Sequence, residues 1–126
     1  MMSWLAVALG GALGATARYA LNLWLSAAPG KFPLATFSAN VLGCFLMGFL
    51  YVAIVDKHVL PMSWRPFLMV GMLGAFTTFS TFSIEALSLW QTQHFTLALV
   101  YVIGSVFASI FAAWLGYTIS EFIFQQ

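Results

Sequence analysis

The sequence has few charges, and they are too scattered to form a basic or acidic surface. Charged residues make up 6% of the 126 positions, with four lysines and arginines against three aspartates and glutamates. A soluble domain typically carries about 25% charged residues. The net charge of +1 argues against nucleic acid as a partner. The scarcity of charge places the protein in a membrane.

Patterns for catalysis and metal binding are also missing. The one cysteine, Cys44, lies within an apolar stretch, which leaves no pair for a disulfide and no cysteine cluster for a metal. His58 and His94 fall in expected loops, and no Ser/His/Asp set or phosphate-binding loop accompanies them. We therefore expect the protein not to be an enzyme.

What the sequence does contain is apolar, with 63% hydrophobic residues and a mean hydropathy of +1.00. Apolar stretches cover residues 3–25, 33–55, 66–90 and 95–122, and about 20 residues suffice for a helix to cross a bilayer. Short polar segments separate these stretches and leave no room for a soluble domain. We predict a single all-α membrane domain over residues 1–126, with four transmembrane helices per chain.

The third stretch contains an unusual segment, GMLGAFTTFSTF, at residues 71–82. Its two glycines weaken a helix, and its threonine and serine hydroxyls can bond nearby backbone groups instead. The pattern predicts a helix that breaks near residues 74–78 and restarts before Phe82. Non-helical backbone in a membrane is tolerated where it is buried in protein or lines a cavity, so such a break indicates an ion or substrate site. The alternative is a Gly/Thr face for helix packing.

The positive charges do not favour one orientation in the membrane. Arg18 and Lys31 fall on one side of the predicted spans, and Lys57 and Arg65 fall on the other. This even division predicts either insertion in both orientations, with two chains paired antiparallel, or an orientation fixed by weaker signals.

Two polar residues of the first two spans need partners. Gly10 and Gly14 precede Arg18 at four-residue steps, and this glycine spacing permits close backbone approach and predicts a helix-packing role. The guanidinium of Arg18 in a membrane must reach the interface, pair with another group or face water. Asn40 shares a helix face with Thr36, and its amide either links two helices or donates to an anion.

The fourth span and the end of the third carry further polar and aromatic side chains. Phe79 and Phe82 share a helix face, where they either pack in a core or present positive ring edges to an anion. Glu85, in one stripe with Thr81, lies either inside the membrane or at its boundary. Hydroxyls recur at four-residue steps along one face of the fourth span, at Tyr101, Ser105 and Ser109. They either form a polar track or bond carbonyls of their own helix, as single serines in membrane helices commonly do.

Three motifs together resemble the Fluc (CrcB) family of small dual-topology fluoride channels. They are GGALGATARY at residues 10–19, TFSANVLGCF at residues 36–45 and GMLGAFTTFSTF at residues 71–82. The motifs resemble the family's patterns GGxxGAxxRY, TxxxNxxGxF and GxxGxxTTFSTF. The resemblance covers the whole chain in order.

The resemblance implies an antiparallel homodimer in the cell (inner or plasma) membrane that exports fluoride passively and relieves its toxicity. Asn40 would donate to fluoride, and two phenylalanines would present ring edges to it. Carbonyls of Gly74 and Thr77 would hold a structural sodium ion, and Arg18 would lie toward a vestibule. The residues that would line or end the fluoride pathway are Thr36, Asn40, Phe79, Thr81, Phe82, Glu85, Tyr101, Ser105 and Ser109.

Two other classes of membrane protein share some of these features. Small multidrug exporters have four spans and dual topology, but they need a carboxylate in the first span, and residues 3–25 contain none. A non-transporting subunit of a larger complex would have no need for the polar track. Fluoride flux through the purified protein distinguishes these classes.

Overall fold

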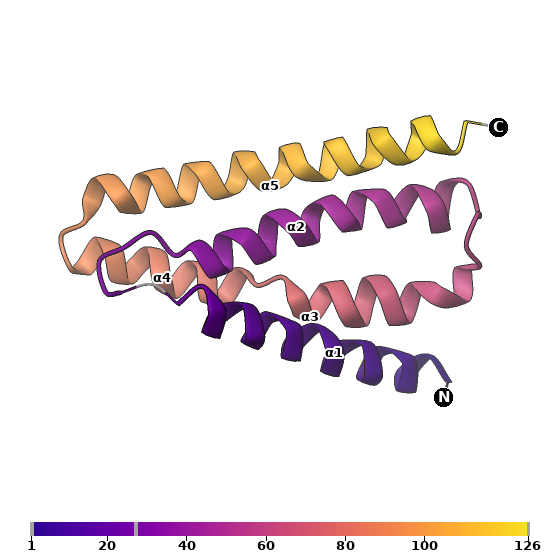
Figure 1. Cartoon of the computed structure of the whole chain (residues 1–126), viewed down its shortest axis with the longest axis horizontal. Helices are drawn as coiled ribbons and strands as arrows, with labels where there is room; N and C mark the ends of the chain where they lie inside the picture. The colour runs from indigo at the N-terminus through magenta and orange to yellow at the C-terminus, as the bar shows by residue number, and fades with distance from the viewer. Residues whose placement is uncertain (1, 27, 126) are drawn as a thin grey trace.

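Four helical spans lie lengthwise beside one another in the computed structural model, which describes residues 2–26 and 28–125 (Figure 1). The spans cover Met2–Trp24, Leu34–Asp56, Met62–Gln91 and Phe95–Ile123, and each is long and apolar enough to cross a membrane. The described residues include no strand. The protein is thus an all-helical, multi-pass membrane protein, and its two ends lie at the same end of the molecule (Figure 1).

The first, second and fourth spans are continuous. Helix α1 covers Met2–Trp24. Helix α2 covers Leu34–Leu50 and continues as a π-helical segment, η1, over Tyr51–Asp56. Helix α5 covers Phe95–Ile123. Their bounds lie within one residue of the predicted stretches.

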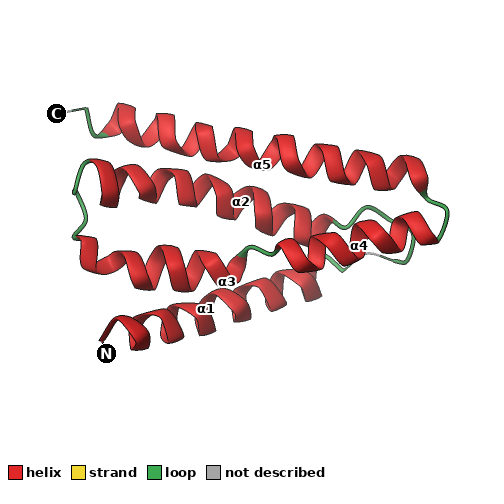
Figure 2. Cartoon of the chain, turned by 180° about the vertical axis from the view of Figure 1, so that it is seen from behind, coloured by secondary structure: helices red, strands yellow, loops and turns green. Residues whose placement is uncertain are grey.

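The third span consists of separate pieces. A 3₁₀ turn, η2, covers Met62–Trp64 and places the start of the span before the predicted residue 66. A π-helical segment, η3, covers Pro66–Leu73, and a last α-helical turn, α3, covers Gly74–Phe76. Helix α4 then covers Phe79–Gln91. Figure 2 shows the interruption as a loop between α3 and α4.

Glycines set the closest helix contacts. A Cβ atom at Gly10 would overlap the Phe67 carbonyl oxygen, and one at Gly14 would overlap the Met72 carbonyl oxygen. The two glycines therefore let α1 lie directly against the backbone of η3. This confirms the packing role predicted for the glycines at four-residue spacing in the first span.

The core of the second half of the bundle forms where α4 meets α5. The buried side chains of Phe82, Leu89, Ala98 and Tyr101 pack together there. Tyr101 has no exposed surface at all. This packing fixes α4 against α5 and carries the polar side chains of both helices toward α2.

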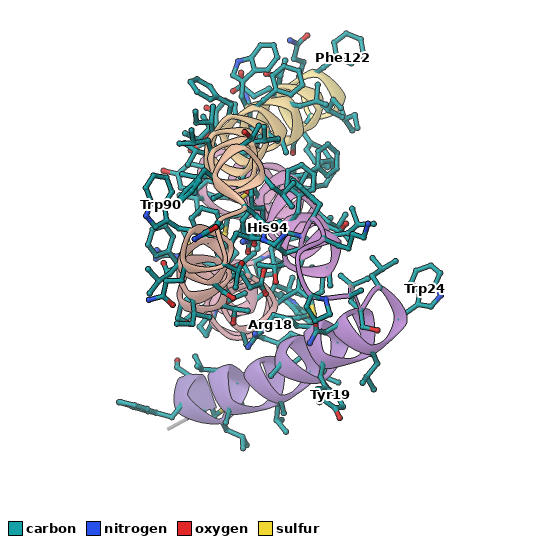
Figure 3. The ribbon with its side chains drawn as sticks, turned by 90° about the vertical axis from the view of Figure 1, so that its left-hand side faces the viewer. Arg18, Tyr19, Trp24, Trp90, His94 and Phe122 are labelled. Carbon is teal, nitrogen blue, oxygen red and sulfur yellow. The ribbon has the colours of Figure 1, made fainter. Side chains whose placement is uncertain are left out.

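The turn between α4 and α5 also holds the loop between α1 and α2. Gly30 in that loop has φ +77°, and a Cβ atom there would lie 2.8 Å from Nε2 of His94. His94, labelled in Figure 3, lies directly before the start of α5. Gly30 is needed both for its backbone conformation and for this close approach.

Candidate functional site

The third span breaks at Thr77 and Thr78, which both have extended backbone, with φ/ψ of −83°/156° and −151°/123°. The N–H and hydroxyl groups of Thr77 both donate to Leu73 O, at 3.1 Å and 3.0 Å, and close the helix before the break. Oγ1 of Thr78 accepts from the Thr81 N–H at 3.1 Å and caps the start of α4. The interruption predicted near residues 74–78 is therefore confirmed.

Asn40 of α2 binds the backbone of the break. Its Nδ2 donates to Thr78 O at 3.0 Å, and its Oδ1 accepts from the Thr78 N–H at 2.8 Å. Gly43, one turn along α2, makes the approach possible, because a Cβ atom there would overlap the methyl group of Thr77. Asn40 thus links two helices, and this pairing uses one of its two amide hydrogens. Donation to fluoride stays a prediction.

A cavity of about 330 Å³ lies beside this pair, between α2, the break, α4 and α5. It brings together five of the residues predicted to line a fluoride pathway. These are Asn40, Phe79, Phe82, Ser105 and Ser109. The cavity therefore gathers one amide, two hydroxyls and two phenyl rings from three different helices.

Ser105 is the polar side chain of this cavity that lacks a partner. Its side chain is 5% exposed, and its Oγ is buried without a hydrogen bond to any described residue. Serines in membrane helices commonly bond a carbonyl of their own helix, and Ser105 does not. An unpaired buried hydroxyl is costly, and this one belongs to a residue that lines the cavity.

The two phenylalanines differ sharply in their surroundings. Their ring centroids lie 5.5 Å apart with planes inclined by 49°. Phe82 is 8% exposed and packs on Tyr101 at 5.1 Å between centroids, whereas Phe79 is 78% exposed. The first ring belongs to the core of this chain, and the second projects from it.

Glu85 lies in a second polar cluster. Thr36 Oγ1 donates to its Oε1 at 2.7 Å, and the Tyr101 hydroxyl donates to its Oε2 at 2.8 Å. A separate cavity of about 330 Å³, covered by the loop between α1 and α2, is lined by Thr36, Glu85 and Lys31. Thr36 and Glu85 therefore line a different cavity from Asn40. Tyr101 contacts both groups, because its hydroxyl bonds Glu85 and its ring packs on Phe82.

Arg18 and Thr81 line a third, smaller cavity of about 140 Å³, which Thr36 also borders. Figure 3 shows Arg18 directed from α1 toward the other helices, while Tyr19 and Trp24 point away. Arg18 Nε donates to Ala75 O at 3.1 Å, in the last turn before the break. This bond places a positive charge at the C-terminal end of a half-helix, where the helix dipole favours it.

The residues expected to bind sodium lie at the two ends of the short helix α3, with Gly74 as its first residue and Thr77 directly after it. Gly74 is exposed and Thr77 is half-buried. The hydrogen bonds at the break engage the carbonyls of Leu73, Ala75 and Thr78. The Gly74 and Thr77 carbonyls do not accept any of these bonds. They are oxygen atoms, the ligands that hard cations prefer. The sodium site stays a prediction.

Several residues that line these cavities were not assigned a role from the sequence, and three of them bear on the site. Cys44 and Thr78 line the cavity beside the break, and Lys31 lines the one with Glu85. The spacing of Cys44 from Asn40 on one helix face was a usable signal for the first. Thr78 has the residue type and position of a helix N-cap, three residues before Thr81.

Comparison with protein families gives one match over most of the chain. A family model described as CrcB-like protein, Camphor Resistance (CrcB), matches residues 5–117. That stretch includes all the residues of the three cavities described above.

Curated relatives agree with this match. A protein of Saccharophagus degradans is 54% identical over 121 residues, which are 96% of this chain and 91% of the relative. One of Magnetococcus marinus is 46% identical, over 93% of this chain and 96% of the relative. One of Paracoccus denitrificans is 43% identical, over 97% of each chain. All three are named fluoride-specific ion channel FluC, a class of transporter and not of enzyme.

Proposed function

Because the chain belongs to the CrcB-like family, we propose that it is a selective fluoride channel, through which fluoride leaves the cell passively. The observation that carries this proposal is the unpaired, buried hydroxyl of Ser105 in a cavity shared with Asn40 and Ser109. Relatives named for fluoride support the choice of ion.

The chemistry of the cavity suits a small, strongly hydrated anion. Among the described residues that line it, none carries a positive charge. Weak neutral donors from Ser105, Ser109 and the second amide hydrogen of Asn40 can replace water around fluoride without trapping it, which conduction requires. The ring edges of Phe79 and Phe82 carry the positive end of the aromatic quadrupole and add to this environment.

The cavity with Glu85 is proposed as the vestibule of the same pathway. Lys31 on its wall attracts anions, and Thr36 and Tyr101 hold both oxygens of Glu85 in place. The contact of Tyr101 with Phe82 then connects the vestibule to the cavity beside the break. Arg18 and Thr81 lie to one side of this route, in the small cavity that Thr36 borders.

We also propose that two copies assemble antiparallel. Gly74 and Ser80 are exposed on either side of the break, and Phe79 projects from the chain. Interrupted backbone cannot face lipid, so these surfaces need a protein partner. The even division of lysines and arginines fits a partner of opposite orientation.

Biasing the insertion tests this assembly. Two added lysines in the loop around Lys57 should fix the orientation of that variant. It should carry no fluoride alone and should regain flux when it is co-expressed with a variant biased through the loop around Lys31. Flux from a single proven orientation would exclude the antiparallel dimer.

A sodium ion between the two breaks is the third part of the proposal. The Gly74 and Thr77 carbonyls of two copies would supply its ligands, as unwound helices of transporters do. The ion's charge would favour nearby anions without the ion being transported. Replacing sodium with N-methyl-D-glucamine should reduce fluoride flux, and sodium should restore it saturably. Flux that is indifferent to sodium after exhaustive dialysis would remove this site.

Ion release from liposomes tests the proposed function itself. Vesicles that contain only this protein should release fluoride down its gradient and retain chloride under the same conditions. Equal release of chloride, or fluoride movement only with an imposed proton gradient, would contradict a selective channel. Protein-free vesicles are the control for leakage.

A further inference from the structure

Cys44 occupies a position that the proposed pathway does not use. It is the one cysteine of the sequence, and it lies on α2 one helical turn beyond Asn40. Its side chain is half-buried and lines the cavity beside the break. Any reaction of a thiol in this protein therefore takes place at the wall of that cavity.

A second side chain marks the same place as a ligand site. Ser105 is 95% buried and lines the same cavity, and its Oγ has no partner among the described residues. Ser109, one turn further along α5, adds another hydroxyl to the wall. Cys44 and Ser105 thus line a shared space of about 330 Å³ from two helices.

We propose that Cys44 binds soft, thiol-seeking metal ions of the mercury(II) class, and that the bound metal blocks the pathway. Sulfur ligands select soft metals over the hard cations that oxygen atoms prefer. With mercuric chloride, a bond forms between Cys44 Sγ and mercury, one mercury–chloride bond breaks, and the thiol proton leaves with that chloride. No electrons are transferred. The remaining chloride completes the linear coordination of the metal.

The geometry explains why the metal obstructs fluoride. The metal adds bulk to the cavity that Cys44 shares with Asn40 and the serines of α5. The blocking part of the proposal rests on the proposed function, because it requires that fluoride pass through this cavity. The binding part does not.

Intact-mass measurement tests the binding. Purified full-length chain treated with mercuric chloride should carry one mercury, which dithiothreitol removes, and the Cys44→Ser variant should carry none. Wild-type protein that takes up no mercury in the folded state would overturn the proposal. This readout does not depend on fluoride transport.

Fluoride release from liposomes tests the block, with each variant compared with its own untreated rate. Mercuric chloride should slow the wild type by about tenfold or more, dithiothreitol should restore the rate, and Cys44→Ser should be unaffected. Wild-type protein that binds mercury and still releases fluoride at its full rate would overturn the block.

A cysteine elsewhere on the same helix provides the matched control. Leu42 is 50% exposed and lines a different, apolar groove of α2 and α5. In the Cys44→Ser background, Leu42→Cys should bind mercury with less than about a twofold change in rate, because the metal lies outside the pathway. Equal inhibition at both positions would contradict the assigned place of the block.

A wild type that releases no fluoride before treatment would refute the proposed function, and the block with it. The mass measurement would still decide the metal site.

Discussion

The two halves of the third span are held in different ways. Before the break, η3 lies against α1 so closely that backbone meets backbone, at Gly14 against Met72 and at Gly71, where a Cβ atom would lie 2.7 Å from Val7 O. After the break, α4 is held by side chains on one face, and its other face, with Phe79 and Ser80, is exposed.

The difference indicates which parts of the protein each chain determines by itself. The first half has its position set within one chain, since glycine contacts leave no freedom for adjustment. The break leaves backbone groups that lipid does not satisfy, and the second half carries exposed hydroxyls and a projecting ring. The proposed pathway lies between the halves, so it depends on both kinds of packing.

Substitution of the packing glycine should have the largest effect on stability. Gly14→Ala places a methyl group on the Met72 carbonyl, and relief requires α1 to move away from η3. The free energy of unfolding should fall by about 1–3 kcal/mol, as measured by denaturation in mild detergent.

Gly104→Ala is the matched control, because a Cβ atom at Gly104 on α5 meets nothing within 4 Å. The same change should be neutral there, or stabilising by up to about 1 kcal/mol through helix propensity. Similar losses at both glycines would contradict the account of the first half.

Loss of the cap should have an intermediate effect, confined to the second half. Thr78→Val removes the oxygen that accepts from the Thr81 N–H, and a lost N-cap costs about 1 kcal/mol. Thr78→Ser keeps the oxygen and should retain most of that stability. Hydrogen exchange at the Thr81 amide should be faster in the valine variant alone. Equal exchange in both variants would show that the hydroxyl does not hold the start of α4.

The smallest expected difference in stability is between substitutions of the two phenylalanines. Phe82→Ile changes a core ring and should lower the free energy of unfolding by about 1 kcal/mol. Phe79→Ile changes a ring that is 78% exposed and should leave the stability of the detergent-isolated monomer nearly unchanged. Both should slow fluoride release, since each removes a ring edge from the cavity. Equal destabilisation of the monomer would contradict the separate roles of the two rings.

The sequence was sufficient for the features that depend on local chemistry. Apolar length predicted four spans, and two glycines with adjacent threonines predicted the break, because both signals act within a few residues. Four-residue glycine spacing likewise predicted the contact of α1 through Gly10 and Gly14.

The arrangement of the site was less accessible, because it depends on contacts between helices. The hydrogen bond of Arg18 to Ala75 O joins residues 57 positions apart, and periodicity within one helix cannot indicate it. The division of the polar residues between two main cavities also depends on contacts between helices, since both cavities draw residues from α2 and α4. Asn40 shows how far the sequence reaches: its residue type implied that it needs a partner, but it did not identify Thr78 as that partner.

The most direct measurement compares fluoride release through Asn40→Asp and Gln91→Glu in parallel liposomes. Both variants replace an amide with a carboxylate, but Asn40 lies at the break, whereas Gln91 is an exposed residue at the end of α4 that lines none of the three cavities. At position 40 the carboxylate faces Thr78 O, loses the amide donor and repels an anion. We expect Asn40→Asp nearly to abolish release and Gln91→Glu to retain most of it. A folded, dimeric Asn40→Asp protein that releases fluoride at the wild-type rate would contradict the account.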